Sequence, residues 1–599
     1  MKLTGSEIIV EMLIEEGMPY VLGITGHGNV ALVDALRRRR DRIRLMTPRH
    51  EQSATHIADG YYRVKGKPLA VTTSIGPGAT NTIIGLATAY VDSIPLMALI
   101  GETHTYMRGV GVLQEVERKT WSDLPSSFEP VVKRAWVISD ARQLPRAVSQ
   151  AFNVMCTGRP GPVLITLPMD VQAQSLEIEA IERPSARRPH DRQPGAPEAI
   201  RKAAELLVNA KRPVIVAGGG TLISGAGDEL KALAEHLGAC VLTTMQGKSV
   251  FPENHPLYGW HTGHNGTVCG NPLAVNADVL LAVGVRFADK GAASYRPGIA
   301  YSIPPTRLIH VDIDPFEIGK NYPVEVGVVG DAKAVLAGLV SAVRELTPPR
   351  AWQNAPYTQE IARRVADHCK TIAKSGETTS TPVTMGRAIA EVRRVLPADG
   401  IVFSSSGLSQ GQIMQEMMFT RPRTYLSEGG NSCMGWAYPA AMGGKLAAPD
   451  APVIALTGDG DFLMTIQEIA TAVQYDLPVV AVVLNNQGWQ SIRDLQRTAF
   501  ADEAAYVTMF EHEGNLITPH LANVARAFGA HGVRVSQPGE IADAVDEALK
   551  AQKPSVVEVL IDTTLGTSGV GYGWWDVPVP HYFEDKYRTY DTARREERV

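Results

Sequence analysis

The sequence lacks both a long hydrophobic run and an excess of positive charge. No apolar stretch reaches the roughly 18 residues that a membrane-spanning helix needs, so we expect no membrane partner. The formal net charge of −5 provides no basic field for a nucleic acid, and we expect no nucleic-acid partner. The dense basic run from Arg37 to Arg40 is interpreted as the solvated end of a helix.

Cysteine is also scarce, and its spacing carries no metal-binding pattern. The chain has five cysteines and no Cys-x-x-Cys pair, which argues against a zinc site and fits reduced thiols in a cytoplasm. We expect no secretory signal, because Glu7, Glu11, Glu15 and Glu16 interrupt the first apolar residues. Thr4 and Glu7 instead predict a capping box on an amphipathic helix. The expected location is therefore cytoplasmic.

Short apolar, β-branched runs alternate with helical patterns along most of the 599 residues. This length is too great for one hydrophobic core, and apolar strands separated by helices indicate parallel sheets covered on both faces. Stretches rich in proline and polar residues interrupt the pattern at 182–199 and at 346–384, the second around a short helix. The predicted fold is α/β, with three doubly wound parallel-sheet domains at 1–183, 195–345 and 378–564 and a C-terminal tail at 565–599.

The tail differs from the domains in composition, because it is rich in aromatic residues and proline. Trp574 and Trp575 would be costly to leave exposed to water. We therefore expect the tail to pack over a domain or over a partner.

Two strand-like runs end in polar residues that suit a cation. The runs 452–457 and 478–484 are followed by Gly-Asp-Gly and Asn-Asn, with a helical pattern between them. Because a right-handed βαβ unit brings both strand ends to the same sheet edge, Asp459 and Asn486 should face one crevice. One carboxylate and one amide oxygen suit Mg²⁺. The unit predicts a site for Mg²⁺ and a diphosphate.

Gly-Asp-Gly followed about 25 residues later by Asn-Asn resembles the signature of thiamine-diphosphate-dependent enzymes. By that resemblance Mg²⁺ is held by Asp459, the Asn486 side chain and the Gly488 carbonyl, and it bridges to the cofactor diphosphate. Close backbone approach and the N–H groups of the following helix also suit an anion. The cofactor-binding residues of this motif include Gly458, Gly460 and Asp461.

Thiamine chemistry also needs a carboxylate away from the diphosphate, to protonate the aminopyrimidine ring of the cofactor. Glu51 follows a predicted strand at 42–46 and meets this need. The residues from Thr47 to Gly101 resemble the pyrimidine-binding domain of the acetohydroxyacid (acetolactate) synthase superfamily. The matching glutamate of that superfamily activates the cofactor.

The resemblance covers nearly the whole chain and implies further cofactor-binding residues. Met434 matches the residue that props the cofactor in its bent shape. Ser432 matches a position whose backbone carbonyl receives the pyrimidine amino group, although the family often has glycine there. The loop that matches the family's diphosphate cradle contains Gly407, Leu408 and Ser409.

The middle of the chain resembles the central domain of the same superfamily. Some members hold FAD structurally in this domain, and Arg286 matches a flavin-contacting arginine. Other members have the same flavoprotein-like fold with no flavin, so the resemblance leaves FAD open. In the family, the activating glutamate and the diphosphate site come from different subunits. This implies self-association as a homodimer or homotetramer, with active sites at the dimer interface.

The residues expected near the reacting atoms lie in loops that follow strands. The catalytic candidates are Glu51, His27 and Gln114. His27 could bind an oxyanion or shuttle a proton, or it could be structural; Gln114 matches a substrate-facing glutamine of the family. The substrate-binding candidates are Thr25, Gly28, Asn29, Trp489 and Gln490.

The resemblance implies that the enzyme forms or cleaves a C–C bond beside a carbonyl through a carbanion-enamine intermediate. We expect a decarboxylating 2-oxo-acid carboligase of acetolactate synthase type. However, "IRDLQRTAF" replaces the family pattern Gln-Trp-Glu-Asp-Arg-Phe-Tyr. Segments such as "TGHGNV", "NSCMGW" and "GYGWWDV" resemble trihydroxycyclohexanedione hydrolase, a C–C hydrolase of a cyclic 1,2-diketone. The substrate is therefore either a 2-oxo acid or a diketone.

A nicotinamide-dependent oxidoreductase is the alternative of another class. Gly26, Gly28 and Ala31 form a Rossmann-like pattern, and Glu51 lies where a ribose-binding acid would be expected. This interpretation leaves Asp459 and Asn486 unexplained, so it is the less favoured.

Overall fold

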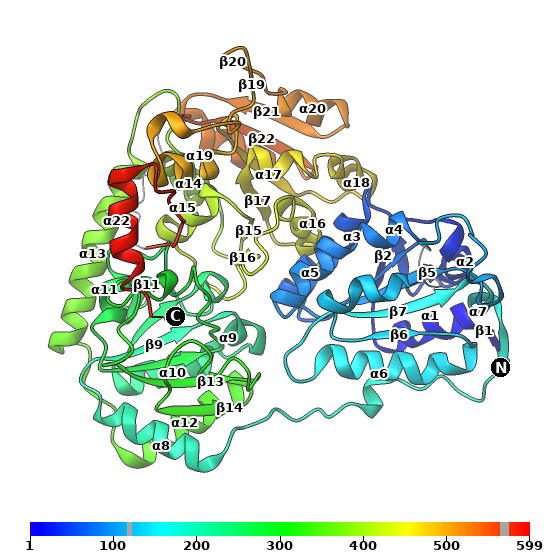
Figure 1. The fold of residues 1–599 in the computed structure, drawn as a ribbon, viewed down its shortest axis with the longest axis horizontal. Helices are drawn as coiled ribbons and strands as arrows, with labels where there is room; N and C mark the ends of the chain where they lie inside the picture. The colour runs from blue at the N-terminus through cyan, green and yellow to red at the C-terminus, as the bar shows by residue number, and fades with distance from the viewer. Residues whose placement is uncertain (117–122, 564–573, 599) are drawn as a thin grey trace. The chain divides into compact units, whose positions relative to one another are not determined.

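The computed structural model describes residues 1–116, 123–563 and 574–598, which fold into two compact units. Unit 1 comprises Met1–Asp191, Glu428–Val453 and Met464–Val479; unit 2 comprises Arg192–Ser427, Ile454–Leu463 and Val480–Val599. The described residues contain three six-stranded sheets with helices between their strands (Figure 1). The predicted α/β fold with parallel sheets is therefore confirmed. Residues 564–573 of the predicted third domain and tail lie outside the described residues.

The six-stranded sheet of unit 1 is parallel, with the strand order β3-β2-β4-β5-β7-β6. Its strands are β2 (Tyr20–Gly23), β3 (Arg44–Met46), β4 (Ala70–Thr73), β5 (Met97–Glu102), β6 (Ala135–Val137) and β7 (Val163–Pro168). Its main helices are α1 (Gly5–Glu15), α2 (Val30–Arg38), α3 (Glu51–Lys65), α5 (Ile83–Val91) and α6 (Leu144–Cys156). The strands β4, β5 and β7 are buried throughout, which explains their continuous apolar sequences. The predicted capping box of α1 is confirmed, since Glu7 N–H donates to Thr4 Oγ1 at 3.2 Å and Thr4 N–H donates to Glu7 Oε2 at 2.9 Å.

Two helices from far along the sequence also belong to unit 1, namely α16 (Ala437–Ala447) and α18 (Glu468–Gln474). Helix α16 packs closely on α3. A Cβ atom on Gly60 would overlap the Ala440 carbonyl, and one on Gly443 would overlap the Ile57 carbonyl. Glycine at both positions therefore lets the two backbones touch.

Unit 2 contains two parallel sheets. The central sheet has the order β11-β10-β9-β12-β13-β14, with strands β9 (Pro213–Ala217), β10 (Cys240–Thr243), β11 (Tyr258–His261), β12 (Val279–Val283), β13 (Arg307–Asp312) and β14 (Val326–Val329). The third sheet has the order β16-β15-β17-β18-β22-β21, with strands β15 (Ile401–Ser404), β16 (Tyr425–Ser427), β17 (Val453–Gly458), β18 (Val480–Asn485), β21 (His531–Val535) and β22 (Ser555–Leu560). Central-domain helices include α8 (Pro197–Asn209), α9 (Gly219–Ser224), α10 (Gly227–Leu237) and α12 (Ala332–Leu346). Later helices include α13 (Pro356–Gly376), α14 (Met385–Val395), α15 (Leu408–Glu416), α17 (Asp459–Leu463), α19 (Gln490–Ala499), α20 (Leu521–Ala527), α21 (Ile541–Lys550) and α22 (Glu584–Arg594).

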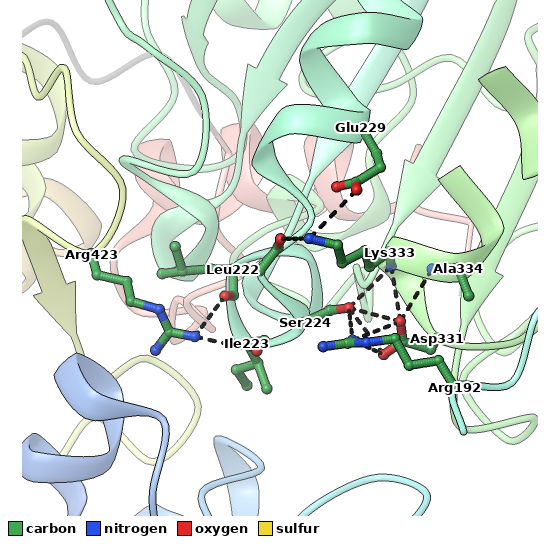
Figure 2. Close-up of polar contacts among 10 residues, drawn as sticks. Arg192, Leu222, Ile223, Ser224, Glu229, Asp331, Lys333, Ala334 and Arg423 are labelled. Carbon is green, nitrogen blue, oxygen red and sulfur yellow. Dashed lines mark hydrogen bonds and ion pairs between the residues drawn. The ribbon is translucent and has the colours of Figure 1, made fainter. Parts of the chain in front are cut away.

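Paired charges fasten the start of unit 2 to its central sheet (Figure 2). The Asp331 carboxylate caps α12 by accepting from Lys333 N–H at 3.1 Å, and it also accepts from Arg192 Nη1 at 2.9 Å and Ser224 Oγ at 3.0 Å. Arg423 Nη2 donates to the Leu222 carbonyl at the end of α9 at 3.1 Å. These contacts give the polar groups in Figure 2 protein partners, so this corner of the central domain has a structural explanation.

The described part of the tail, residues 574–598, packs on unit 2, as expected for the tail. Trp575 Nε1 donates to Asp289 Oδ2 at 3.1 Å, and the Lys290 ammonium lies 5.2 Å from the Trp575 ring centroid. The Arg296 guanidinium lies 5.3 Å from the Trp574 ring centroid. Cation–π contacts of this kind give the two half-buried indoles protein partners.

Two expected helices differ in the structure. The short helix expected inside 346–384 is α13, which runs for 21 residues. The single helix expected between the two polar strand ends is divided into α17 and α18, with a turn at 464–467. In that turn, Thr465 Oγ1 donates to the Gly435 carbonyl at 3.1 Å, a long-range contact that a local helical pattern does not encode.

Candidate active site

The polar ends of β17 and β18 form the candidate diphosphate site in unit 2. The two strands are parallel neighbours, with Gly458 opposite Leu484. Asp459 and Asn486 therefore lie at one sheet edge, as predicted. Asp459 Oδ1 accepts from the Asn486 N–H at 3.4 Å, and Oδ2 accepts from the Gly488 N–H at 3.2 Å. The carboxylate thus fixes the loop that carries the other two expected metal ligands.

The electrostatics of this pair fit a divalent cation. Burial raises the pKa of Asp459 to about 6, although backbone N–H groups partly oppose that shift. The buried Oδ1 of Asn486 has no hydrogen-bond partner among the described residues. A buried carbonyl oxygen without a donor is uncommon and calls for a ligand. One carboxylate and one free amide oxygen are a donor set that Mg²⁺ accepts, with water or phosphate oxygens completing its shell.

Asp461 has a positioning role within the motif. It is buried, its carboxylate accepts from Thr457 Oγ1 at 2.5 Å, and its other oxygen accepts from Ser405 Oγ. It therefore ties the end of β17 to the loop that precedes α15.

That loop brings Gly407, Leu408 and Ser409 to the start of α15. Gly407 has φ 125° and precedes the helix without a side-chain cap, and a Cβ added to it would meet nothing within 4 Å. Open space before an uncapped helix start suits a diphosphate oxygen. A Cβ on Gly458 would likewise meet nothing within 4 Å.

Trp489 and Gln490 follow the expected metal ligands; Trp489 precedes α19, and Gln490 is its first residue. A Cβ on Gly460 would overlap the Trp489 ring, which explains the second glycine of Gly-Asp-Gly. The Trp489 ring also makes an edge contact with Phe510, with centroids 5.0 Å apart. Gln490 is buried. The two side chains therefore form a packed wall beside the metal motif.

Glu51 is the first residue of α3 in unit 1, at the candidate pyrimidine site. Its Oε2 accepts from Asn81 Nδ2 at 2.9 Å, and a Cβ on Gly78 would lie 3.1 Å from Oε1. Asn81, which caps the C-terminal end of the short helix α4 (Pro77–Thr80), was not singled out from the sequence. The pair gives the carboxylate a fixed direction.

The loop after β2 contains two kinds of residue: some are held by hydrogen bonds, and one has a buried atom without a partner among the described residues. Asn29 Oδ1 accepts from Gly26 N–H at 2.9 Å, and its Nδ2 donates to Thr72 Oγ1 at 3.3 Å, so Asn29 holds the loop. Gly28 N–H donates to Ser74 Oγ at 3.1 Å. The buried Nε2 of His27 has no hydrogen-bond partner among the described residues, while Thr25 is exposed.

The segment with Ser432 and Met434 is held by a buried charge network in unit 1. Asp92 accepts from the N–H groups of Gly429 at 3.1 Å and Gly430 at 2.9 Å. Ser432 has φ 53°, in the left-handed region that favours glycine, which explains why the family often has glycine there.

Gln114 lies in an exposed loop with φ 66°, and its carbonyl occupies the space that a Cβ on Gly76 would need. Its backbone therefore touches the loop after β4. Its expected contact with substrate stays a prediction.

A polar cluster at the end of β5 was not predicted from the sequence. Glu102 Oε1 lies 2.9 Å from Arg108 Nη2, whereas the buried Glu102 Oε2 and Thr103 Oγ1 have no hydrogen-bond partner among the described residues. Burial raises the pKa of Glu102, against opposing hydrogen bonds. A Cβ on Gly101 would overlap the Gly28 carbonyl, so the cluster adjoins the His27 loop. The polar run "ETHT" directly after a buried strand was the available signal.

Comparisons with known proteins agree with this arrangement. Three models of the thiamine pyrophosphate enzyme family match the chain: the N-terminal TPP binding domain at residues 3–121, the central domain at 200–339 and the C-terminal TPP binding domain at 405–559. A probable acetolactate synthase large subunit from Methanocaldococcus jannaschii is 35% identical over 571 residues, covering 94% of this chain and 92% of the relative. The acetolactate synthase isozyme 3 large subunit of Escherichia coli is 33% identical over 574 residues, covering 94% and 95%.

The chain therefore belongs to the thiamine-diphosphate-dependent enzymes of the acetolactate synthase superfamily. It is a thiamine-diphosphate-dependent enzyme, which confirms the predicted family and cofactor. The Rossmann-like Gly26–Ala31 pattern falls within the matched N-terminal TPP binding domain. Within residues 1–116, 123–563 and 574–598, no helix combines the length and apolar character needed to cross a bilayer.

Proposed function

We propose that the protein is a Mg²⁺-dependent, decarboxylating carboligase of acetolactate synthase type that acts on a 2-oxo acid. The observation that carries this proposal is the buried Asp459 carboxylate beside the unpartnered Asn486 oxygen. It occurs in a chain that is 35% identical to a protein named as a probable acetolactate synthase large subunit. The donor set supports Mg²⁺, and the relatives' names support the reaction.

The residues of this chain would divide the work between binding and proton transfer. When bound, thiamine diphosphate would supply a nucleophilic carbon for chemistry at the carbonyl of a 2-oxo acid. Asp459, Asn486 and the Gly488 carbonyl would hold the metal, while Gly407, Leu408 and Ser409 would receive the diphosphate. Glu51, directed by Asn81, would hold a proton at the pyrimidine ring nitrogen. The unpartnered Nε2 of His27 is available for an oxyanion or for a proton of the substrate.

One assay tests this function directly. The purified chain, with thiamine diphosphate and Mg²⁺, is incubated with pyruvate, and acetolactate and CO₂ are measured. We expect both products, and neither after chelation of the metal. Absence of product together with no thermal stabilisation by cofactor and Mg²⁺ would reject the proposal.

A second candidate, a C–C hydrolase of a cyclic 1,2-diketone, is favoured by the cluster at the end of β5. Three buried polar atoms in this region have no hydrogen-bond partner among the described residues and are available to a ligand: Glu102 Oε2, Thr103 Oγ1 and His27 Nε2. A polyhydroxylated ring offers more matching hydrogen bonds than the methyl group of pyruvate. Ring opening of a cyclic 1,2-dione to an acid, with no turnover of pyruvate, would select this candidate.

We propose that the active assembly is a homodimer or a larger homo-oligomer built from it. The family places the activating glutamate and the metal motif in different subunits, and here Glu51 and Asp459 belong to different units of the chain.

FAD has no part in the proposal. In the central domain, close to Arg286, aromatic side chains pack on one another: the ring centroid of Phe287 lies 5.2 Å from that of Tyr301 and 5.2 Å from that of Tyr322.

A further inference from the structure

Helix α19 buries polar residues and exposes an apolar one. Gln490 is 2% exposed and Arg493 is 5% exposed, whereas Ile492 is 50% exposed. Helices on a protein surface normally turn their apolar side inward. The reversal indicates that the inner side of α19 faces polar groups or a polar ligand. This helix is also where "IRDLQRTAF" departs from the family pattern.

The buried guanidinium of Arg493 has too few partners. Its Nη1 contacts Met509 Sδ at 3.1 Å, a weak acceptor. Its Nε and Nη2 have no hydrogen-bond partner in the described part of the chain. Asp494 Oδ1 lies 3.8 Å from Nε, within ion-pair range but beyond good hydrogen-bond distance. Asp562 adds a second negative charge to the surroundings of Arg493, and Arg497 adds a like charge one turn later. The charge of Arg493 thus has acidic neighbours, but two of its buried N–H groups lack a hydrogen-bond acceptor, which is unfavourable until an acceptor binds.

Arg493 lies one side chain away from the candidate metal site. Its backbone N–H donates to the Trp489 carbonyl at 3.0 Å. Met509, which its guanidinium contacts, pairs by a β-bridge with Gly488, and a Cβ on Gly488 would lie 3.1 Å from Met509 Sδ. The guanidinium and the expected metal-ligand loop therefore both lie beside Met509.

We propose that Arg493 binds the carboxylate of the 2-oxo acid substrate through Nε and Nη2. These two nitrogens form one edge of the guanidinium fork, which matches a carboxylate with two parallel hydrogen bonds. The expected binding site of the cofactor diphosphate is the metal motif and the start of α15, so Arg493 is available for a different anion. The inference rests on the proposed function, because it names the group by which that site selects its substrate. Arg493 would thus favour acids over neutral ketones.

Binding of a non-reacting acid tests the inference without turnover. Oxamate, an isostere of pyruvate, is titrated by calorimetry into the chain loaded with thiamine diphosphate and Mg²⁺. We expect Arg493→Met to weaken oxamate binding at least tenfold and Arg493→Lys to weaken it less, because the charge remains and the fork is lost. The affinity for thiamine diphosphate should stay unchanged in both variants. Arg394→Met, at an exposed arginine of the same unit, is the matched control.

Thermal unfolding separates a binding role from a structural one. Without ligands, Arg493→Met should change the Tm little, because the loss of the long ion pair with Asp494 is offset by the removal of buried N–H groups that lack acceptors. A lowered Tm with unchanged oxamate affinity, weaker thiamine diphosphate binding alone, or no oxamate binding by the wild-type chain would overturn the inference. If oxamate binding depends on Arg493 but pyruvate gives no acetolactate, the carboxylate site stands and the proposed reaction fails.

Discussion

Arg63 and Asp92 form a buried ion pair in unit 1, with Arg63 Nη2 2.9 Å from Asp92 Oδ2. Arg63 also pairs with Asp59, and its guanidinium lies 5.0 Å from the centroid of the Trp436 ring. Because Asp92 also accepts from Gly429 and Gly430, the pair fixes the entry to the Ser432–Met434 segment. A charge network far from the metal motif in the sequence therefore determines where the expected cofactor prop lies.

Replacing Asp92 tests that dependence. Asp92→Asn should destabilise the chain by roughly 3 kcal/mol, because it leaves Arg63 with less compensating charge in a buried position. Thiamine diphosphate should also bind more weakly. Calorimetric unfolding and cofactor titration measure the two effects. Asp34→Asn, which breaks an exposed ion pair with Arg37, is the control and should change stability by less than about 1 kcal/mol. Equal effects from both variants would contradict the prediction.

Glu51 and Asn81 should differ in what they contribute. Glu51→Gln should keep cofactor affinity while turnover falls by roughly 10² to 10⁴, since a general acid–base group is lost. Asn81→Ala should cause a smaller loss, because the carboxylate remains but loses one directing hydrogen bond. Cofactor titration and steady-state kinetics distinguish the two. Full activity in Glu51→Gln would remove Glu51 from the mechanism.

Mixed oligomers test whether an active site uses two subunits. Glu51→Gln and Asp459→Ala should each be inactive alone. After unfolding and refolding an equimolar mixture, roughly a quarter of wild-type activity should return, because half of the dimers are mixed and each has one intact site. A mixture that stays inactive, while wild-type chain recovers under the same refolding, would place both residues of a site in one subunit.

Glu102 should make stability depend on pH. Burial raises its pKa in the folded chain, so the folded state binds the proton more readily than the unfolded state. The contribution of Glu102 to the free energy of unfolding is therefore complete below its ordinary pKa. It is lost as the pH rises through the raised pKa of the folded state. Glu102→Gln should remove this decline, which Tm measurements from about pH 4 to about pH 8 would show as a flatter profile. Parallel profiles for both proteins would contradict the assignment.

Local sequence patterns predicted the strands, the capping box and the neighbouring positions of Asp459 and Asn486, because each depends on contacts close along the chain or on βαβ geometry. They did not predict Asn81 beside Glu51, a contact that joins the start of α3 to the end of a separate short helix. They also missed the Asp92 contacts to Gly429 and Gly430, which join residues hundreds of positions apart. The division between α17 and α18 was not predicted either, because it depends on the long-range contact of Thr465 with Gly435. The predicted domain boundaries, and the roles of Gln114, Trp489 and Gln490 towards a substrate, stay predictions.

The close crossing of α3 and α16 has a consequence for dissecting the protein into fragments. A fragment that ends in the proline-rich stretch at 182–199 would contain the whole six-stranded N-terminal sheet but would lack α16 and α18. The α3 backbone around Gly60, which lies against Ala440 in the full chain, would then be open to solvent or to another molecule. Truncation at this sequence boundary should therefore yield an incomplete fragment that is prone to self-association. A circularly permuted chain, or two co-expressed fragments, would be the better starting point.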